Sequence, residues 1–170
     1  FTLARFSEAF LVLRALQGGM AVAYAPLVLI AMNVIYAAGA YPFGKWSDRM
    51  SHSRLLAWGL VVLIAADGLL AVSNQWPWVW VGILLWGLHM AMTQGLLAAM
   101  VAATAPADLR GTAFGFFNLL SGIALLIASG LAGLLWDQLG ASFTFASGAV
   151  FSLFALGLIL LNYGAPRIPA

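Results

Sequence analysis

The sequence consists almost entirely of long apolar stretches separated by brief polar breaks. Hydrophobic residues make up 64% of the 170 residues and charged residues only 7%, whereas a soluble domain carries about 25% charged residues. One membrane-spanning helix needs roughly 20 apolar residues. Six such helices with short loops therefore account for the whole chain, and we predict an all-α membrane protein with no sizeable domain outside the bilayer.

Glycine, proline and charged residues divide the chain into six predicted spans. These spans cover residues 1–17, 22–43, 55–73, 77–104, 112–136 and 141–163. Small residues spaced four apart in the fifth span, such as Ala124 and Ala128, predict that it packs closely on two sides. Because Phe1 lies inside an apolar run with no signal-peptide features, we expect the chain to be part of a longer protein.

The cationic residues fall in alternate loops. One side carries Lys45, Arg49, Arg54, Arg110 and Arg167, and the connections 18–21, 74–76 and 137–140 carry none. Since cytoplasmic loops are enriched in Lys and Arg, both ends of the chain and the loops 44–54 and 105–111 are expected in the cytoplasm. We expect a multi-pass protein of the bacterial inner (plasma) membrane.

The second and fifth spans end in similar patterns. Gly44 and Asp48 are four residues apart where the second span leaves the membrane, and Gly133 and Asp137 are four apart at the end of the fifth. The orientation above puts the two pairs on opposite sides. This arrangement is what an inverted repeat of three plus three helices requires, although two such matches can also arise by chance.

With six helices and the loop Gly44-Lys45-Trp46-Ser47-Asp48-Arg49-Met50-Ser51-His52-Ser53-Arg54, the sequence resembles the major facilitator superfamily of secondary transporters. The loop is similar to the family's G-x-x-x-D-R-x-G-[RK]-[RK] motif. Gly44, Asp48 and Arg49 match, whereas Ser51 replaces the usual Gly and His52-Ser53 replace the basic pair. A second family-like turn runs from Pro106 to Gly115 and includes Arg110 and Gly111.

The resemblance implies that residues 1–170 form the C-terminal six-helix bundle, helices seven to twelve, of a twelve-helix transporter whose N-terminal half is absent. It also implies a gating role for Gly44, Asp48, Arg49, Arg54, Arg110 and Gly111. Asp48 could face the N-terminus of the fifth span near Thr112, where a carboxylate is favoured by roughly 0.3 to 2 kcal/mol. Alternatively, the loop cations serve only to set the topology.

Three charged residues lie in the first span. Arg5 and Glu8 are three residues apart and can pair with each other, and both are candidates for the substrate or proton pathway. Arg14 points to another side of the helix and has no obvious local partner. It could meet an anionic substrate group or an acid of the missing half, or its side chain could extend to the outer surface.

The remaining candidates lie in the third and fourth spans. Trp86, His89 and Thr93 share one helical face with Gln94 beside it, and the resemblance implies that this helix lines the cavity. His89 could contact substrate or relay a proton, or it could simply be hydrogen-bonded. Asp67 could carry a proton, have a structural partner or extend to the interface.

No usual catalytic motif occurs, including H-E-x-x-H and G-x-S-x-G, and two His with no Cys make a metal site improbable. The net charge of +2 without a basic cluster argues against nucleic acid as a partner. We expect no enzyme and no cofactor, but a proton-coupled transporter of a small solute, with drug or metabolite efflux as one form. Its expected partners are the N-terminal half, lipid, substrate and protons. The alternative is a non-transporting structural or pseudo-transporter fragment.

Overall fold

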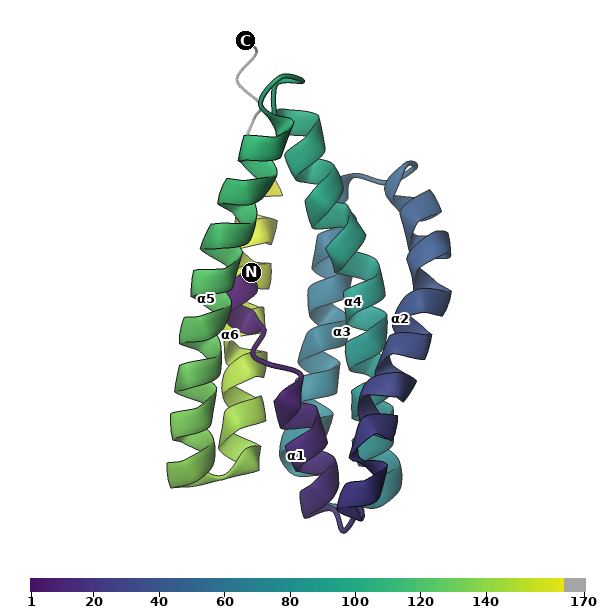
Figure 1. Ribbon diagram of the computed structural model, residues 1–170, viewed down its shortest axis with the longest axis vertical. Coiled ribbons are helices and arrows are strands. Elements are labelled where there is room, and N and C mark those ends of the chain that lie inside the picture. Colours follow the sequence, from purple (N-terminus) through teal and green to yellow (C-terminus); the bar gives the residue numbers. More distant parts are fainter. Residues whose placement is uncertain (164–170) are drawn as a thin grey trace.

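The computed structural model describes residues 1–163, which are helical apart from short connections. The elements are the 3-10 turn η1 (Thr2–Ala4), α1 (Ala9–Gln17), the 3-10 turn η2 (Val22–Tyr24), α2 (Ala25–Ser47), α3 (His52–Val72), α4 (Trp76–Thr104), α5 (Arg110–Leu139) and α6 (Ala141–Tyr163). The long helices run alternately in opposite directions (Figure 1). Five segments of the described chain are long and apolar enough to cross a membrane: Val22–Ser47, His52–Val72, Trp76–Thr104, Arg110–Leu139 and Ala141–Leu161.

The prediction of one continuous helix over residues 1–17 is wrong. η1 ends at Arg5, whose backbone is extended, and α1 begins only at Ala9. A nine-residue helix is about 13.5 Å long, less than half of the roughly 30 Å hydrocarbon core. The polar residues Arg5, Ser7 and Glu8 occupy the break. Because the residues around them are apolar, the hydropathy pattern does not indicate an interruption.

The other helices begin and end close to the predicted residues. α2 continues beyond Pro42 to Ser47, so the first part of the predicted loop is the last turn of a helix. Gly19 and Gly140 have φ angles of 94° and 87°, a left-handed conformation that favours glycine. The Gly140 N–H closes the end of α5 by donating to the carbonyls of Leu135 and Trp136.

The most extensive packing joins α3 with α4, α3 with α6, and α2 with α4. Glycine permits the close approach of α2 and α4. A Cβ on Gly87 of α4 would collide with the backbone carbonyl of Met32, and one on Gly39 of α2 would lie 2.7 Å from the Ala91 Cβ. Trp86, Phe145 and Leu63 are fully buried in the core beside these contacts.

α5 is packed less closely than the sequence suggests. It contacts α6, η1 and, less extensively, α4. Only Ala128 and Ala132 are buried along it, and a Cβ added to Gly115 or Gly133 would meet open space. α5 therefore contacts α6 as well as η1 and α4, as the prediction of packing on two sides requires, but Gly115 and Gly133 permit no close backbone approach among the described residues.

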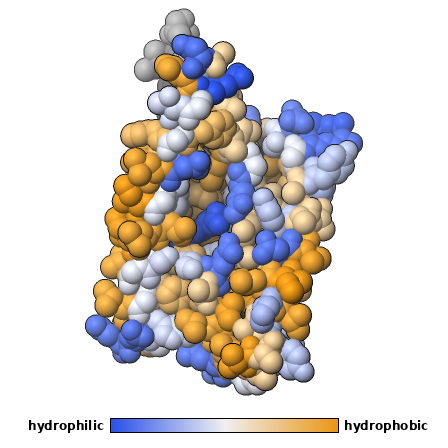
Figure 2. Space-filling view, in the orientation of Figure 1, coloured by the Kyte–Doolittle hydropathy of each residue, from blue (hydrophilic) through white to orange (hydrophobic). Residues whose placement is uncertain are grey.

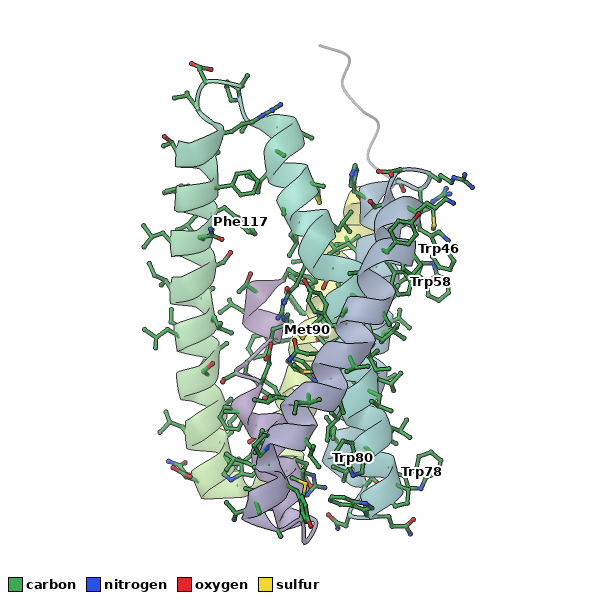
Figure 3. All side chains as sticks on the ribbon, turned by 45° about the vertical axis from the view of Figure 1, so that its right-hand side comes forward. Trp46, Trp58, Trp78, Trp80, Met90 and Phe117 are labelled. Carbon is green, nitrogen blue, oxygen red and sulfur yellow. The ribbon has the colours of Figure 1, made fainter. Side chains whose placement is uncertain are left out.

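The two ends of the bundle differ in charge. Lys45, Arg49, Arg54 and Arg110 lie at the end formed by the α2–α3 and α4–α5 turns (Figure 1), whereas Arg167 is outside the described residues. Tryptophans lie toward both ends, with Trp46 and Trp58 at one and Trp78 and Trp80 at the other (Figure 3). Indole rings favour the two membrane interfaces. Phe1 lies about halfway along the bundle instead of at the cationic end.

Substitution of Gly87 by Ala should destabilise the contact between α2 and α4. The added Cβ cannot be accommodated without moving the Met32 backbone, and overpacking of this kind costs about 1 to 3 kcal/mol. Thermal unfolding of the purified protein in detergent would measure the loss. Gly68→Ala is the control, because a Cβ there meets nothing within 4 Å. Equal melting temperatures for the two variants would contradict the prediction.

Candidate functional site

A cleft of about 330 Å³ lies between η1, α4 and α5. Its lining includes Thr2 and Arg5 from the N-terminal segment, Gln94 from α4, and Asn118 and Ser121 from α5. Figure 2 shows hydrophilic side chains gathered in a hollow on this face, bordered by hydrophobic surfaces. Its volume is within the range of about 300 to 1,000 Å³ typical of small-molecule sites.

One face of α5 forms the wall of this cleft. Its lining residues are Phe114, Phe117, Asn118, Ser121, Gly122 and Leu125. They recur at intervals of three or four positions, the spacing that places residues on the same side of a helix. Phe117 lies on the side of α5 that faces α4 (Figure 3). The wall therefore combines aromatic rings with amide and hydroxyl groups.

Arg5 is the only charged side chain among the residues that line this cleft. Its Nε atom is buried and has no hydrogen-bond partner in the structure. Glu8 acts on it electrostatically, but no ion pair joins these two side chains in the described part of the chain. The expected pairing of Arg5 with Glu8 is therefore not formed, because the helix that would align them is broken.

The break itself is tied to α5. The backbone N–H of Ser7 donates to the Ser129 hydroxyl oxygen at 3.0 Å, and the N–H of Ala9 donates to the Ser7 hydroxyl at 3.3 Å. Unsatisfied backbone groups are costly in lipid. Ser129 thus supplies a partner that the interrupted helix cannot provide.

Arg14 has its main partners at the end of another helix, 56 to 60 positions along the chain. Its side chain is buried, its Nε donates to the Leu70 carbonyl at 2.9 Å, and its Nη2 donates to the Ser73 carbonyl at 2.6 Å and Asn74 Oδ1 at 3.0 Å. These acceptors lie at the C-terminal end of α3, where a positive charge is favoured. Arg14 therefore fastens α1 to α3 and does not line the cleft.

The face formed by Trp86, His89 and Thr93 does not line the cleft either. All three side chains are fully buried. His89 Nδ1 is 2.7 Å from the Gly59 carbonyl of α3, and the Thr93 hydroxyl donates to the His89 carbonyl at 2.8 Å. Because Gly59 has no side chain, this face of α4 packs directly on α3. Of the candidates on α4, Gln94 lines the cleft.

Asp67 is fully buried where α3, α4 and α6 meet. The indole N–H of Trp86 donates to its Oδ1 at 2.8 Å, while Oδ2 has no hydrogen-bond partner in the structure. A Cβ on Gly148 of α6 would lie 2.6 Å from Oδ2, so glycine provides the space for the carboxyl group. Asp67 therefore has a structural partner, Trp86, which was one of the alternatives expected for it.

The predicted gating residues lie at the cationic end of the bundle. Gly44, Asp48, Arg49, Arg54, Arg110 and Gly111 are all exposed there. α4 separates the C-terminal end of α2 from the start of α5 (Figures 1 and 3). The predicted contact of Asp48 with the start of α5 is therefore not formed, since the two ends lie on opposite sides of α4.

Comparison with known proteins identifies the family. The model of the Major Facilitator Superfamily matches residues 19–170. The chain belongs to this superfamily. Members of the superfamily are membrane transporters and not enzymes, and the six-helix arrangement is consistent with half of a major facilitator fold.

Two known proteins are similar to this chain in sequence. An uncharacterized MFS-type transporter of Methanocaldococcus jannaschii is 32% identical over 168 residues, which cover 95% of this chain and 42% of the relative. A facilitated glucose transporter homolog of Caenorhabditis elegans is 27% identical over 134 residues, which cover 76% of this chain and 26% of the relative. The chain thus spans less than half the length of either relative.

Several residues of the cleft were not predicted from the sequence. Thr2, Asn118 and Ser121 were not proposed as pathway residues, although the helical spacing of Phe114, Asn118 and Ser121 could have indicated a polar face on α5. The hydrogen bond from Trp86 to Asp67 joins residues 19 positions apart. No local pattern indicates such a contact, because it depends on how α3 and α4 pack.

Replacing Arg14 by Gln should reduce the free energy of unfolding without changing the lining of the cleft. Hydrogen bonds from a charged donor contribute about 1.5 to 3 kcal/mol each, and the shorter amide cannot reach the same acceptors. Denaturation in detergent would quantify the loss. The free energy of unfolding of Arg14→Lys should lie between those of the wild type and Arg14→Gln, since lysine keeps the charge but lacks the planar guanidinium group. A wild-type stability for Arg14→Gln would refute this assignment.

Proposed function

We propose that the chain forms one six-helix half of a secondary transporter that moves a small solute by alternating access. The observation that carries this proposal is the polar cleft on one face of an otherwise apolar bundle. Major facilitator transporters bind substrate near the midplane, between two such halves. The cleft opens on one face of the bundle, and a second six-helix unit would cover this face. α5 and α2 form the two borders of the face.

We assign the chain to the C-terminal half, with helices seven to twelve corresponding to the six predicted spans. Support comes from the loop between Gly44 and Arg54, whose pattern is a degenerate form of the family motif. The relatives' greater length supports the existence of an N-terminal half as partner. In this assignment the cationic end of the bundle faces the cytoplasm, as the positive-inside rule predicts, and a bacterial inner membrane is the proposed location.

We also propose that the gating residues contact the other half of the transporter, instead of α5. Asp48 is exposed and does not reach α5, so a partner that closes the cytoplasmic side has to come from outside this chain. A helix N-terminus of the other half would suit Asp48, and Arg49 and Arg110 would be available to its acidic residues. A bias of 1 to 2 kcal/mol from such contacts is enough to change the populations of two conformations.

The alternative function is that of a structural or pseudo-transporter unit without transport activity. The uneven packing of the bundle argues against it. A purely structural unit has no need for the unpaired Arg5 Nε or for a helix interrupted within the membrane, both of which reduce stability. Features of this kind are retained where a binding site requires them.

Reconstitution of the chain with and without a matching N-terminal half would test the transport proposal. Flux of a small solute in proteoliposomes should appear only with both halves, because one half encloses no pathway. A set of small organic solutes would be screened, including glucose in view of the name of one relative. Absence of flux for every solute, from a complex shown to be folded, would favour the structural alternative.

Asp67 favours proton coupling as the energy source for this transport. It is a fully buried carboxyl with one oxygen unpartnered, and no cation lies within ion-pair distance of it among the described residues. Intramembrane carboxyl groups commonly act in proton relays. Since α4 carries both Trp86 and the cleft residue Gln94, protonation of Asp67 could be linked to the position of the cleft wall.

Substitution of Asp67 by Asn should abolish solute accumulation driven by a pH gradient and leave solute exchange intact. The amide keeps an oxygen for the Trp86 N–H but cannot exchange a proton, so uptake driven by an imposed pH gradient should fall to the level without a gradient. Solute exchange at equal pH should persist. Asp137→Asn, at an exposed helix end, serves as the control. Unchanged gradient-driven accumulation in Asp67→Asn would exclude this residue as the proton carrier.

A further inference from the structure

The cleft between η1, α4 and α5 contains a positive charge that forms no ion pair with the described residues. Among the described residues that line it, Arg5 is the only charged side chain, and the remaining polar groups are the uncharged residues Thr2, Gln94, Asn118 and Ser121. None of these residues can neutralise a guanidinium group. Glu8 is the acidic side chain of the described residues that acts on Arg5 electrostatically.

The local alternatives for neutralising Arg5 are not realised. Glu8 forms no ion pair with it among the described residues, and Glu8 does not line the cleft. The Arg5 Nε is buried yet donates no hydrogen bond. Arg14, the other arginine near the break, uses its donors on the end of α3. An unpaired buried donor on a charged group is costly, so a ligand that accepts from Arg5 gains an interaction not satisfied within the chain.

The rest of the cleft indicates the form of such a ligand. Phe1, Phe114 and Phe117 contribute aromatic rings, and Leu97 and Leu125 add aliphatic surface. Amide and hydroxyl groups stand beside these apolar groups. A flat or compact apolar body with one anionic group matches this combination, because arginine binds carboxylates through two parallel hydrogen bonds and aromatic rings bury apolar area.

We propose that the cleft selects small organic anions with an apolar body, and that Arg5 is the residue that contacts the anionic group. This inference rests on the proposed transport function and adds the chemical class of the substrate. Gln94 and Asn118 then orient the bound anion from the two opposite helices. Phe114 and Phe117 contact its apolar part from α5.

A matched pair of probes tests the role of charge. Benzoate and benzamide have the same ring and nearly the same shape, but only benzoate is an anion at neutral pH. Binding of each would be measured by the shift in melting temperature of the full-length transporter in detergent, and uptake would be measured in proteoliposomes. Benzoate should bind and be taken up saturably, whereas benzamide should be roughly tenfold weaker or more, since charge-assisted hydrogen bonds exceed neutral ones by this amount.

Variants of Arg5 test the residue itself. Arg5→Gln should weaken the binding of benzoate roughly tenfold and remove the preference for benzoate over benzamide. Arg5→Lys should retain part of this preference because it keeps the charge. The melting temperature without probe establishes that each variant is folded. An Arg5→Gln protein that is folded and still prefers benzoate would overturn the inference.

Other outcomes distinguish this inference from the transport proposal. Equal uptake of benzamide and benzoate, or transport only of neutral solutes such as glucose, would overturn the anion selectivity and leave the transport function in place. If Arg5→Gln abolishes the transport of neutral and anionic solutes alike, Arg5 instead pairs with an acid elsewhere in the transporter. No transport of any solute would count against the proposed function, and with it against this inference.

Discussion

In a lipid environment every backbone N–H and C=O group needs a partner within the protein, and this requirement governs how the N-terminal helical segment can be interrupted. The interruption between Arg5 and Glu8 is possible because Ser129 of α5 accepts the Ser7 N–H. The same hydrogen bond holds α5 against the N-terminal segment. The irregular backbone and the wall of the cleft therefore depend on each other, and neither is a separate feature of the bundle.

The bundle divides into a closely packed part and a more open part. α3 is covered by α4 and α6, and glycines at Gly59 and Gly87 let α4 approach its neighbours closely. The buried Asp67 and His89 both bond within this packed part. α5 has only two buried residues along its length. The polar groups that face the cleft are thus carried on one side by the closely packed helix α4 and on the other by α5, which has few contacts.

Much of the fold follows from the sequence, because a membrane span has a strong and simple signature. The ends of the last five helices, the cationic end of the bundle and the end of the first span at Gln17 were all predicted from apolar length, charge and turn residues. The break after Arg5 was not, since Ser7 and Glu8 are too few to interrupt the apolar pattern. Of the candidates expected from the sequence, Arg5 and Gln94 line the cleft, whereas His89 and Thr93 are hydrogen-bonded within the bundle. Helical periodicity alone does not choose between these alternatives, because the choice of face depends on where Gly59 allows α3 to approach. The partners of Arg14 and Asp67 lie 56 and 19 positions away, beyond the reach of helical periodicity.

The difference between α4 and α5 has a consequence for how proteins of this kind can diversify. A substitution on the glycine-lined faces of α4 changes the backbone positions of its neighbours, so these positions tolerate little variation. The cleft-facing positions of α5, such as Asn118 and Ser121, can change while only a few contacts are disturbed. New solute preferences would therefore arise most readily through mutations in α5, with the α3–α4 framework inherited unchanged.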